Sequence, residues 1–180
     1  MKKIIAAARS REEYALALES DVDTVFMLAP DIADIKAQAD MAHNVGKKYF
    51  MHIDLAEGVG KDEAGILFVK GLGVDGIIST RTNLIKLAKK AGVFTVQRFF
   101  IVDSRSVETT VEAAGSSKAD MIEIMPGVVP KIISRLKSKL EMPIVVGGLI
   151  ESEDEIRQAL DGGAHAVSVS KRIFWREDII

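Results

Sequence analysis

Two segments in the C-terminal third of the chain have a composition suited to binding an anion. IVVGGLI (144–150) is a run of branched apolar residues that ends in two glycines, and AVSVSKR (166–172) ends in hydroxyl and basic residues. Glycines let backbone N–H groups approach an anion because no Cβ stands in the way. We therefore predict a phosphate-binding cradle, with tight helix–strand packing at the glycines as the alternative. The candidate phosphate ligands are Gly147, Gly148, Ser168, Ser170 and Lys171.

Six further charged or polar residues lie inside or directly after apolar runs. His52 in such a run is either a core residue satisfied by hydrogen bonds or part of a site. Glu123 lies in DMIEIM, and a buried carboxylate is costly unless it is paired. We expect one of three arginines to pair with it, or a role in binding a ligand, because a carboxylate accepts two hydrogen bonds from hydroxyls. The six candidates are Arg9, His52, Asp54, Arg81, Arg98 and Glu123.

The spacing of these residues gives little support to a metal site. His52, Asp54 and Glu123 are chemically able to bind a metal, but no HxH or HExxH spacing joins them. The other two histidines, His43 and His165, fall on predicted surfaces. We predict no metal and no cofactor.

These residues need strands to position them, and apolar runs alternate with helical segments along the whole chain. Helix starts are predicted by capping signals, such as Ser10 with Glu13 and Ser152 with Glu155, and by Asp31 before residues 32–45. Alternation along a strand places His52 and Asp54 on the same side. The predicted strands are 3–8, 24–28, 48–54, 76–79, 93–99, 120–125, 143–146 and 164–169.

Eight strand–helix units indicate a closed (β/α)8 barrel of the TIM type, built as one domain over residues 1–180. About 250 residues is typical of this fold, so the loops must be short, and a doubly wound sheet is the alternative. Sites in this fold lie at the carboxyl ends of the strands, and a phosphate often binds after strands seven and eight beside an extra helix N-terminus. We expect residues 173–175 to seal the barrel or to form a contact between copies.

The composition restricts the class of protein. The chain has 180 residues, of which 48% are hydrophobic and 28% charged, enough for a large core and a charged surface. The absence of cysteine excludes disulfides, thiolate metal sites and cysteine nucleophiles. A net charge of -2 argues against a uniformly basic nucleic-acid-binding protein but permits a local basic patch. No apolar run approaches the roughly 20 residues of a membrane span or the core of a signal peptide, so we expect a cytoplasmic protein without a membrane partner.

Seven segments together resemble the bacterial glycerol-3-phosphate-responsive antiterminator family, also described as glycerol uptake operon antiterminator regulatory proteins. They reach from the first predicted strand to the last, although residues 20–45 match poorly. The combination of HID, DGIISTR, QRFF and EIMPG makes the resemblance specific. The segments are IIAAAR (4–9), HIDLAEGVGKDEAG (52–65), DGIISTRTNLIKLAKKAG (75–92), QRFFIVDSRS (97–106), IEIMPGVVPKII (122–133), PIVVGGLI (143–150) and GAHAVSVSKRIFW (163–175).

The resemblance implies a (β/α)8-type barrel that senses glycerol 3-phosphate and binds the leader mRNA of glycerol-utilisation genes, so that RNA polymerase passes a terminator. On this interpretation the glycine and serine candidates hold the phosphate, and the six charged or polar candidates surround the glycerol portion. Two residues depart from the family's pattern. Met125 replaces the usual leucine of EILPG, and we expect this swap of similar volume to be neutral. Val169 removes a hydroxyl next to the proposed phosphate site, so we expect Ser170 to contribute more of the contact.

Two predicted helices carry basic residues that could contact RNA, although a solvated basic face is the alternative for both. The small number of aromatic residues favours contacts to the phosphate backbone over base readout. The candidate RNA contacts are Lys86, Lys89 and Lys90 on one helix, and Lys131 and Arg135, with Lys137 and Lys139 beyond them, on the other.

The alternative function is an enzyme acting on a small phosphorylated metabolite, of the aldolase or isomerase type, with His52 or Glu123 as acid/base. We expect no catalytic residue, because no lysine stands at a predicted strand end to form a Schiff base and short loops leave little material for a lid. A third hypothesis is an interaction scaffold with a vestigial site. Association of copies into a homo-oligomer through exposed apolar helix faces stays open.

Overall fold

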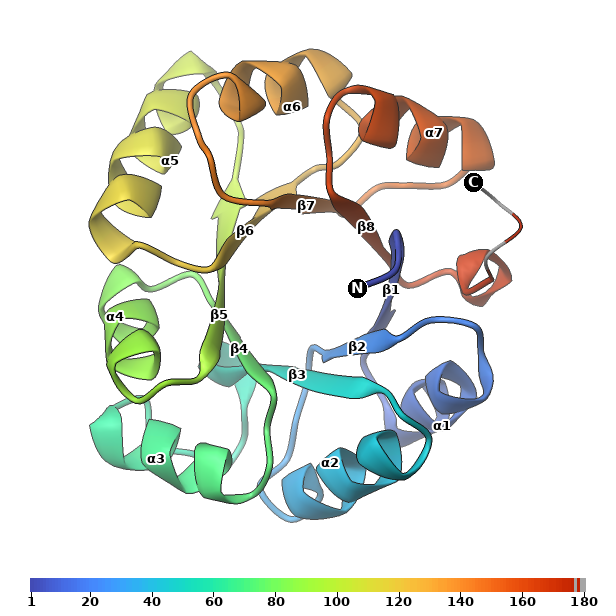
Figure 1. The fold of residues 1–180 in the computed structure, drawn as a ribbon, viewed down its shortest axis with the longest axis vertical. Coiled ribbons are helices and arrows are strands. Elements are labelled where there is room, and N and C mark those ends of the chain that lie inside the picture. The colour runs from blue at the N-terminus through green and yellow to red at the C-terminus, as the bar shows by residue number, and fades with distance from the viewer. Residues whose placement is uncertain (177, 179–180) are drawn as a thin grey trace.

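Eight parallel strands form a closed barrel in the computed structural model, which describes residues 1–176 and 178 (Figure 1). Each strand pairs with the next along the chain, and β8 pairs with β1 to close the ring. This confirms the predicted (β/α)8 fold and rules out the doubly wound sheet. The strands are β1 (Ile4–Ala8), β2 (Thr24–Met27), β3 (Lys48–His52), β4 (Gly76–Ser79), β5 (Phe94–Phe100), β6 (Met121–Met125), β7 (Ile144–Gly147) and β8 (Ala166–Val169).

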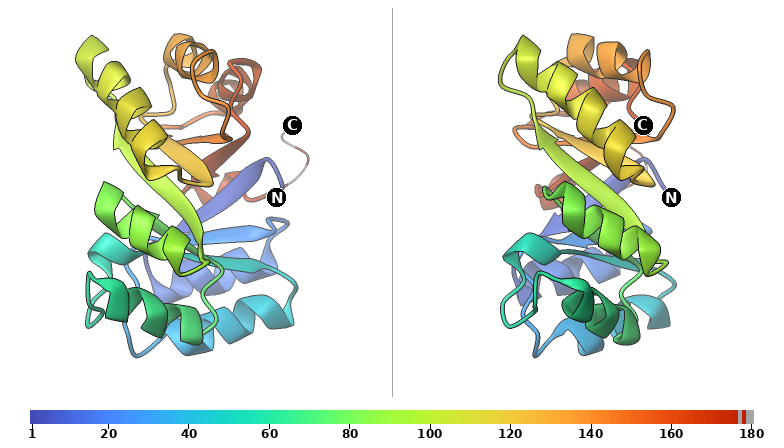
Figure 2. Two further views of the ribbon diagram at one scale, coloured as in Figure 1. Left: turned by 60° about the vertical axis from the view of Figure 1, so that its left-hand side comes forward. Right: turned by 90° about the vertical axis from the view of Figure 1, so that its left-hand side faces the viewer.

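Helices cover the outside of the barrel and connect successive strands (Figure 1). β5 is a seven-residue strand that crosses the wall obliquely beside α4 and α5 (Figure 2). Two short 3-10 helices, η1 (Ile53–Leu55) and η2 (Arg172–Phe174), follow β3 and β8. The α-helices are α1 (Arg11–Glu19), α2 (Ile35–Asn44), α3 (Glu63–Gly71), α4 (Thr82–Lys90), α5 (Ser104–Ser117), α6 (Pro130–Lys137) and α7 (Glu153–Asp161).

Local capping explains where several helices begin. Ser152 and Glu155 form the predicted capping box at α7. Ser10 accepts a hydrogen bond from the Glu13 N–H at 3.2 Å, also as predicted, but the Glu13 carboxylate reaches back to the N–H of Arg9 at 2.6 Å instead of to Ser10. That bond ties the end of β1 to the first turn of α1.

The prediction that Asp31 caps the helix from residue 32 is wrong. α2 begins only at Ile35, after Asp34, and Asp31 accepts the Ala33 N–H in a preceding turn. Asp34 provides no side-chain cap because its carboxylate pairs with Arg11 of α1 at 2.6 Å. A tertiary ion pair thus sets this helix start.

The alternation of side chains divides the core in two. Most buried apolar residues lie between the strands and the helices. A second cluster fills the inside of the barrel, where the rings of Phe26 and Phe50 stack with centroids 5.5 Å apart. The inside cluster is Ile5, Ala7, Phe26, Leu28, Phe50, Ile78, Val96, Met121, Val145 and Ala166. The barrel is therefore packed with side chains, as is usual for this fold.

The segment after β8 occupies the position where an eighth helix would stand. Phe174 and Trp175 are buried, and the Trp175 indole N–H donates to the carbonyl of Val169 at 2.8 Å. Ile173 is 66% exposed. The expectation that this segment seals the barrel holds for two of its three apolar residues. No helix among the described residues is long and apolar enough to cross a membrane.

Candidate functional site

A layer of polar residues lies above the apolar filling, towards the carboxyl ends of the strands. Residues two apart on a strand face the same side, so the position two residues after an inward apolar residue also faces inward. On five strands that position is buried and holds a polar residue or a glycine, whereas the corresponding residues after β1 and β4, Arg9 and Thr80, are exposed. We call these five the polar layer: His52, Arg98, Glu123, Gly147 and Ser168.

Glu123 is the centre of the polar layer. Its carboxylate is fully buried and accepts hydrogen bonds from Arg98 Nε at 2.7 Å and from the Ser168 hydroxyl at 2.6 Å. Arg98 and Glu123 are direct partners in the register of β5 and β6. The structure thus selects Arg98 from the three arginines expected to pair with this carboxylate.

Gly147 makes room for the bond between Ser168 and Glu123. A Cβ added at Gly147 would lie 2.1 Å from the Ser168 hydroxyl oxygen and 3.2 Å from a Glu123 carboxylate oxygen. The first glycine of the pair therefore has a packing role inside the barrel, and the Ser168 hydroxyl is already bonded there. Direct contact of these two residues with a phosphate stays a prediction.

Two buried polar atoms of the polar layer have no hydrogen-bond partner among the described residues, His52 Nδ1 and Arg98 Nη2. His52 is 3% exposed and Arg98 6%. Burial, and next the positive charge of Arg98, lower the pKa of His52 to about 4, so the imidazole is neutral at pH 7. A neutral imidazole offers one donor and one acceptor nitrogen. An unpaired buried polar group costs about 1–3 kcal/mol, so a polar ligand that reaches both atoms gains that energy.

Asp54 lies beside the polar layer, and the prediction that it continues the strand on the side of His52 is wrong. β3 ends at His52, and the 3-10 turn η1 breaks the alternation. The Asp54 carboxylate accepts hydrogen bonds from the Ser79 hydroxyl at 2.8 Å and the Thr80 N–H at 2.7 Å, and lies 3.7 Å from Arg81. Burial acts to raise the pKa of Asp54, but these hydrogen bonds outweigh it and the pKa is lowered. Asp54 thus holds the loop after β4 and leaves Arg81 half-exposed at the edge of the barrel.

The exposed edge of the barrel above the polar layer supplies positive charge and free N–H groups. The Arg9 side chain is exposed at the end of β1, beside β8, and has no partner among the described residues. Lys171 is held weakly by Glu151, whose carboxylate lies 3.9 Å from the ammonium and whose carbonyl accepts from it at 3.4 Å. Within the described chain, four backbone N–H groups here have no acceptor: those of Gly148, Leu149, Ser170 and Lys171.

The expected helix N-terminus beside this edge is very short. η2 spans only three residues, Arg172–Phe174, with Lys171 before it. The macrodipole of one 3-10 turn is small, so an anion here would depend on individual N–H groups and side chains.

Lys61 was not predicted as a site residue, although it lies in the loop after η1. Its ammonium donates to the carbonyl oxygens of Ala56 and of Val59, the latter at 2.9 Å. Burial lowers the pKa of Lys61. A lysine in a glycine-bearing loop gives no sequence signal for this, because both acceptors are backbone atoms.

The candidate RNA contacts lie on two separate helices. On α4, Lys89 pairs with Asp120 at 2.5 Å, Lys90 with Glu63 at 3.2 Å, and the Lys86 ammonium donates to a hydroxyl of α5 at 2.9 Å. On α6, Lys131 has no partner among the described residues. Their contact with RNA stays a prediction, but the α4 lysines are engaged within the protein.

Comparison with known proteins yields one family. The profile described as glycerol-3-phosphate responsive antiterminator matches residues 4–175. A glycerol uptake operon antiterminator regulatory protein from Listeria monocytogenes str. 4b F2365 is 35% identical, and the match covers 96% of this chain and 94% of that one with a TM-score of 0.90. A glycerol uptake operon antiterminator-related protein from Thermotoga maritima MSB8 is also 35% identical, over 97% of this chain and 98% of that one, with a TM-score of 0.86.

A third relative is YgcP of Escherichia coli K12, an uncharacterized protein that is 35% identical over 96% of this chain and 91% of its own length. Solved aldolases match at 16% identity or lower, which shows the fold alone.

Proposed function

Because the chain belongs to the glycerol-3-phosphate responsive antiterminator family, we propose that it binds glycerol 3-phosphate at the carboxyl end of the barrel and that the bound ligand changes its affinity for the leader mRNA of glycerol-utilisation genes. The observation that carries the proposal is the pair of buried polar atoms, His52 Nδ1 and Arg98 Nη2, that have no protein partner among the described residues. An alcohol both donates and accepts a hydrogen bond. Adjacent hydroxyls of a glycerol group can therefore satisfy an arginine donor and an imidazole nitrogen together.

The phosphate group belongs at the exposed edge. There Arg9 contributes an unpaired cation, Lys171 a weakly held one, and the turn after β7 contributes free N–H groups. Gly148 has a φ of +75°, a conformation that suits glycine, and its bare backbone lets an anion approach closely. Glycerol 3-phosphate would thus lie with its hydroxyls inward and its phosphate outward.

The family is regulatory, and the site gives little support to the aldolase or isomerase alternative. None of the inward positions at the strand ends of the described barrel holds a lysine that could form a Schiff base. The Glu123 carboxylate is bonded to Arg98 and Ser168, so neither of its oxygens is a free base. We therefore assign the site to binding and no residue to catalysis.

Calorimetry with glycerol 3-phosphate, glycerol and inorganic phosphate tests the proposal. We expect Arg98→Lys to weaken glycerol 3-phosphate by about tenfold, or 1.4 kcal/mol, because lysine keeps a charge for Glu123 but lacks the second guanidinium nitrogen. Arg157→Lys on the surface of α7 is the matched control and should bind as wild type does. Unchanged affinity in Arg98→Lys would refute the site.

The regulatory part needs a second measurement. If ligand and RNA are coupled, glycerol 3-phosphate changes the RNA affinity by the same factor by which RNA changes the affinity for glycerol 3-phosphate. Equal RNA affinity with and without the ligand would contradict a switch. Conversion of the ligand during long incubation, detected by phosphorus NMR, would instead favour the enzyme.

A further inference from the structure

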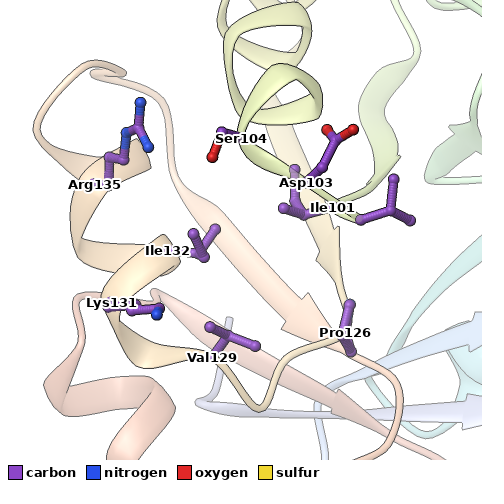
Figure 3. A pocket seen from close by; sticks show the side chains of 9 residues that line it. Ile101, Asp103, Ser104, Pro126, Val129, Lys131, Ile132 and Arg135 are labelled. Carbon is purple, nitrogen blue, oxygen red and sulfur yellow. The ribbon is translucent and has the colours of Figure 1, made fainter.

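A groove of about 640 Å³ lies between the start of α5 and the start of α6 (Figure 3). Its apolar lining includes Ile101, Pro126, Val129 and Ile132. Lys131 and Arg135 project from α6, and Figure 3 shows Arg135 facing the first residue of α5 across the groove. The groove therefore combines an apolar surface with basic side chains.

The cations of this groove are available to a partner. Lys131 has no ion pair among the described residues, and Arg135 forms a long ion pair with Glu108 at 4.0 Å. The Asp103 carboxylate also lines the groove, but it caps α5 by accepting the Ser106 N–H at 2.8 Å. On α6, therefore, Lys131 is unpaired and Arg135 is only weakly paired, whereas Lys89 and Lys90 of α4 form ion pairs at 2.5 and 3.2 Å.

A second hollow, of about 300 Å³, adjoins the groove, because Val102 and Asp103 line both. Its lining includes Phe100, which is 57% exposed, and Arg105, whose side chain has no partner among the described residues. Val102 lines both hollows and is 85% exposed. Cations and an exposed aromatic ring therefore line two adjoining hollows that share Val102 and Asp103.

This pattern fits single-stranded nucleic acid better than an acidic protein segment. Proteins that bind single strands combine a positive groove for the backbone with aromatic side chains for the bases. An acidic helix would need only the charge and the apolar floor, and would leave Phe100 unused.

The two strands that carry the Arg98–Glu123 pair continue directly into this surface. Three residues after Arg98, the Ile101 N–H donates to the carbonyl of Met125 at 2.8 Å, and Pro126 follows as part of the groove. Movement of β5 against β6 on ligand binding would therefore change the distance between the two sides of the groove.

We propose that these two hollows form the surface that holds a single-stranded segment of RNA, and that ligand bound at Arg98 and Glu123 controls it through the ends of β5 and β6. Phosphates lie on Lys131, Arg135 and Arg105, and a base stacks on Phe100. This location rests on the proposed function, since it presumes RNA binding that responds to the ligand.

The test measures the fluorescence anisotropy of a labelled RNA that has been selected from a random pool on the wild-type protein. The RNA is about 20 nucleotides long, which is more than the ~4–16 nucleotides that one single-strand site covers. Lys131→Ala/Arg135→Ala should weaken binding by about tenfold at ~0.15 M salt and reduce the slope of log K against log salt by about 1.4, the value for two phosphate contacts on a single strand. The control Lys137→Ala/Lys139→Ala removes the same amount of charge from nearby positions that do not line the groove. It should leave the RNA affinity and the salt slope nearly unchanged.

Phe100→Ala should weaken the binding of RNA by about fivefold or more, because a base can no longer stack on the ring. Phe68→Ala on α3 is the matched control. Phe68 is also exposed, at 47%, but it lines neither of the two hollows. Every variant, controls included, should bind glycerol 3-phosphate alone as wild type does, which shows that it is folded. Only Phe100→Ala and Lys131→Ala/Arg135→Ala should lose the tightening of ligand binding that RNA brings.

The outcomes separate this location from the proposed function. If the wild-type protein selects no RNA, or binds it equally with and without ligand, the proposed function fails. If the wild type shows ligand-dependent binding but the groove and control variants weaken it equally, the location is overturned. The location would also be overturned, in favour of a protein partner, if the groove variants still bound RNA as wild type does but no longer bound an acidic peptide that the wild type binds.

Discussion

Gly147→Ala tests the packing of the polar layer directly. The added methyl would lie 2.1 Å from the Ser168 hydroxyl oxygen and 3.0 Å from the Ser168 carbonyl oxygen. The serine hydroxyl can rotate away, but it then gives up its hydrogen bond to the buried Glu123. A hydrogen bond to a charged group contributes about 1.5–3 kcal/mol, and the remaining crowding adds about 1 kcal/mol, so we expect a loss of about 3 kcal/mol in the free energy of unfolding.

The double variant Gly147→Ala/Ser168→Ala makes the reasoning refutable. Ser168→Ala alone should cost about 1.5–3 kcal/mol, and the double variant should cost about as much as Gly147→Ala alone because the same hydrogen bond is lost only once. Urea unfolding followed by circular dichroism gives the four free energies of the cycle. Gly115→Ala is the control, since nothing lies within 4 Å of its added Cβ in α5, and it should stabilise the protein by about 0.5–1 kcal/mol. Additive losses in the cycle would show that the methyl does not meet Ser168.

Three further predictions concern the charges of the site. Glu123→Gln should destabilise the fold by about 3–5 kcal/mol in urea unfolding because it leaves the Arg98 charge buried without its partner, and adding Arg98→Met should recover most of the loss; no recovery would contradict the pairing. The pKa of His52 is lowered from 6.5 to about 4, so the unfolded chain binds its proton first; stability should therefore fall by about 3 kcal/mol as the pH drops from 6.5 to about 4, and His52→Gln, compared at matched pH, should remove that share. Asp54→Asn should cost about 1.5–3 kcal/mol because an amide accepts the Thr80 N–H less strongly than a carboxylate does, and an unchanged urea midpoint would show that the loop after β4 does not depend on this charge.

The barrel could be predicted from sequence because its signal is local and repeats eight times. Each strand is a short apolar run, and each helix has its own start and stop residues. The site was only partly predictable, because its contacts join residues that are distant along the chain. The sequence indicates that Glu123 needs an arginine, but Arg98 is selected by the register of β5 and β6, which joins residues 25 positions apart.

Other features depend on contacts that a single segment does not contain. The two adjacent glycines suggest an anion-binding turn, whereas the packing role of Gly147 follows from Ser168 on the neighbouring strand. The start of α2 depends on Arg11 of α1, and Asp54 leaves the strand pattern through a 3-10 turn that no residue type announces. In each case the deciding partner is close in space and distant along the chain.

The charges of the polar layer also decide the orientation of an anionic ligand. Arg98 is balanced by Glu123, and burial together with the charge of Arg98 lowers the pKa of His52 and keeps it neutral. The inside of the barrel therefore carries no net positive charge from these three residues. A phosphate placed there would meet the fully buried Glu123 carboxylate and would lose its hydration without a balancing charge. At the exposed edge the phosphate keeps part of its hydration and lies near the unpaired Arg9. Inorganic phosphate should therefore bind the edge without any help from Arg98, whereas glycerol 3-phosphate should bind more tightly only while the polar layer is intact; equal sensitivity of both ligands to Arg98→Lys would reverse this orientation.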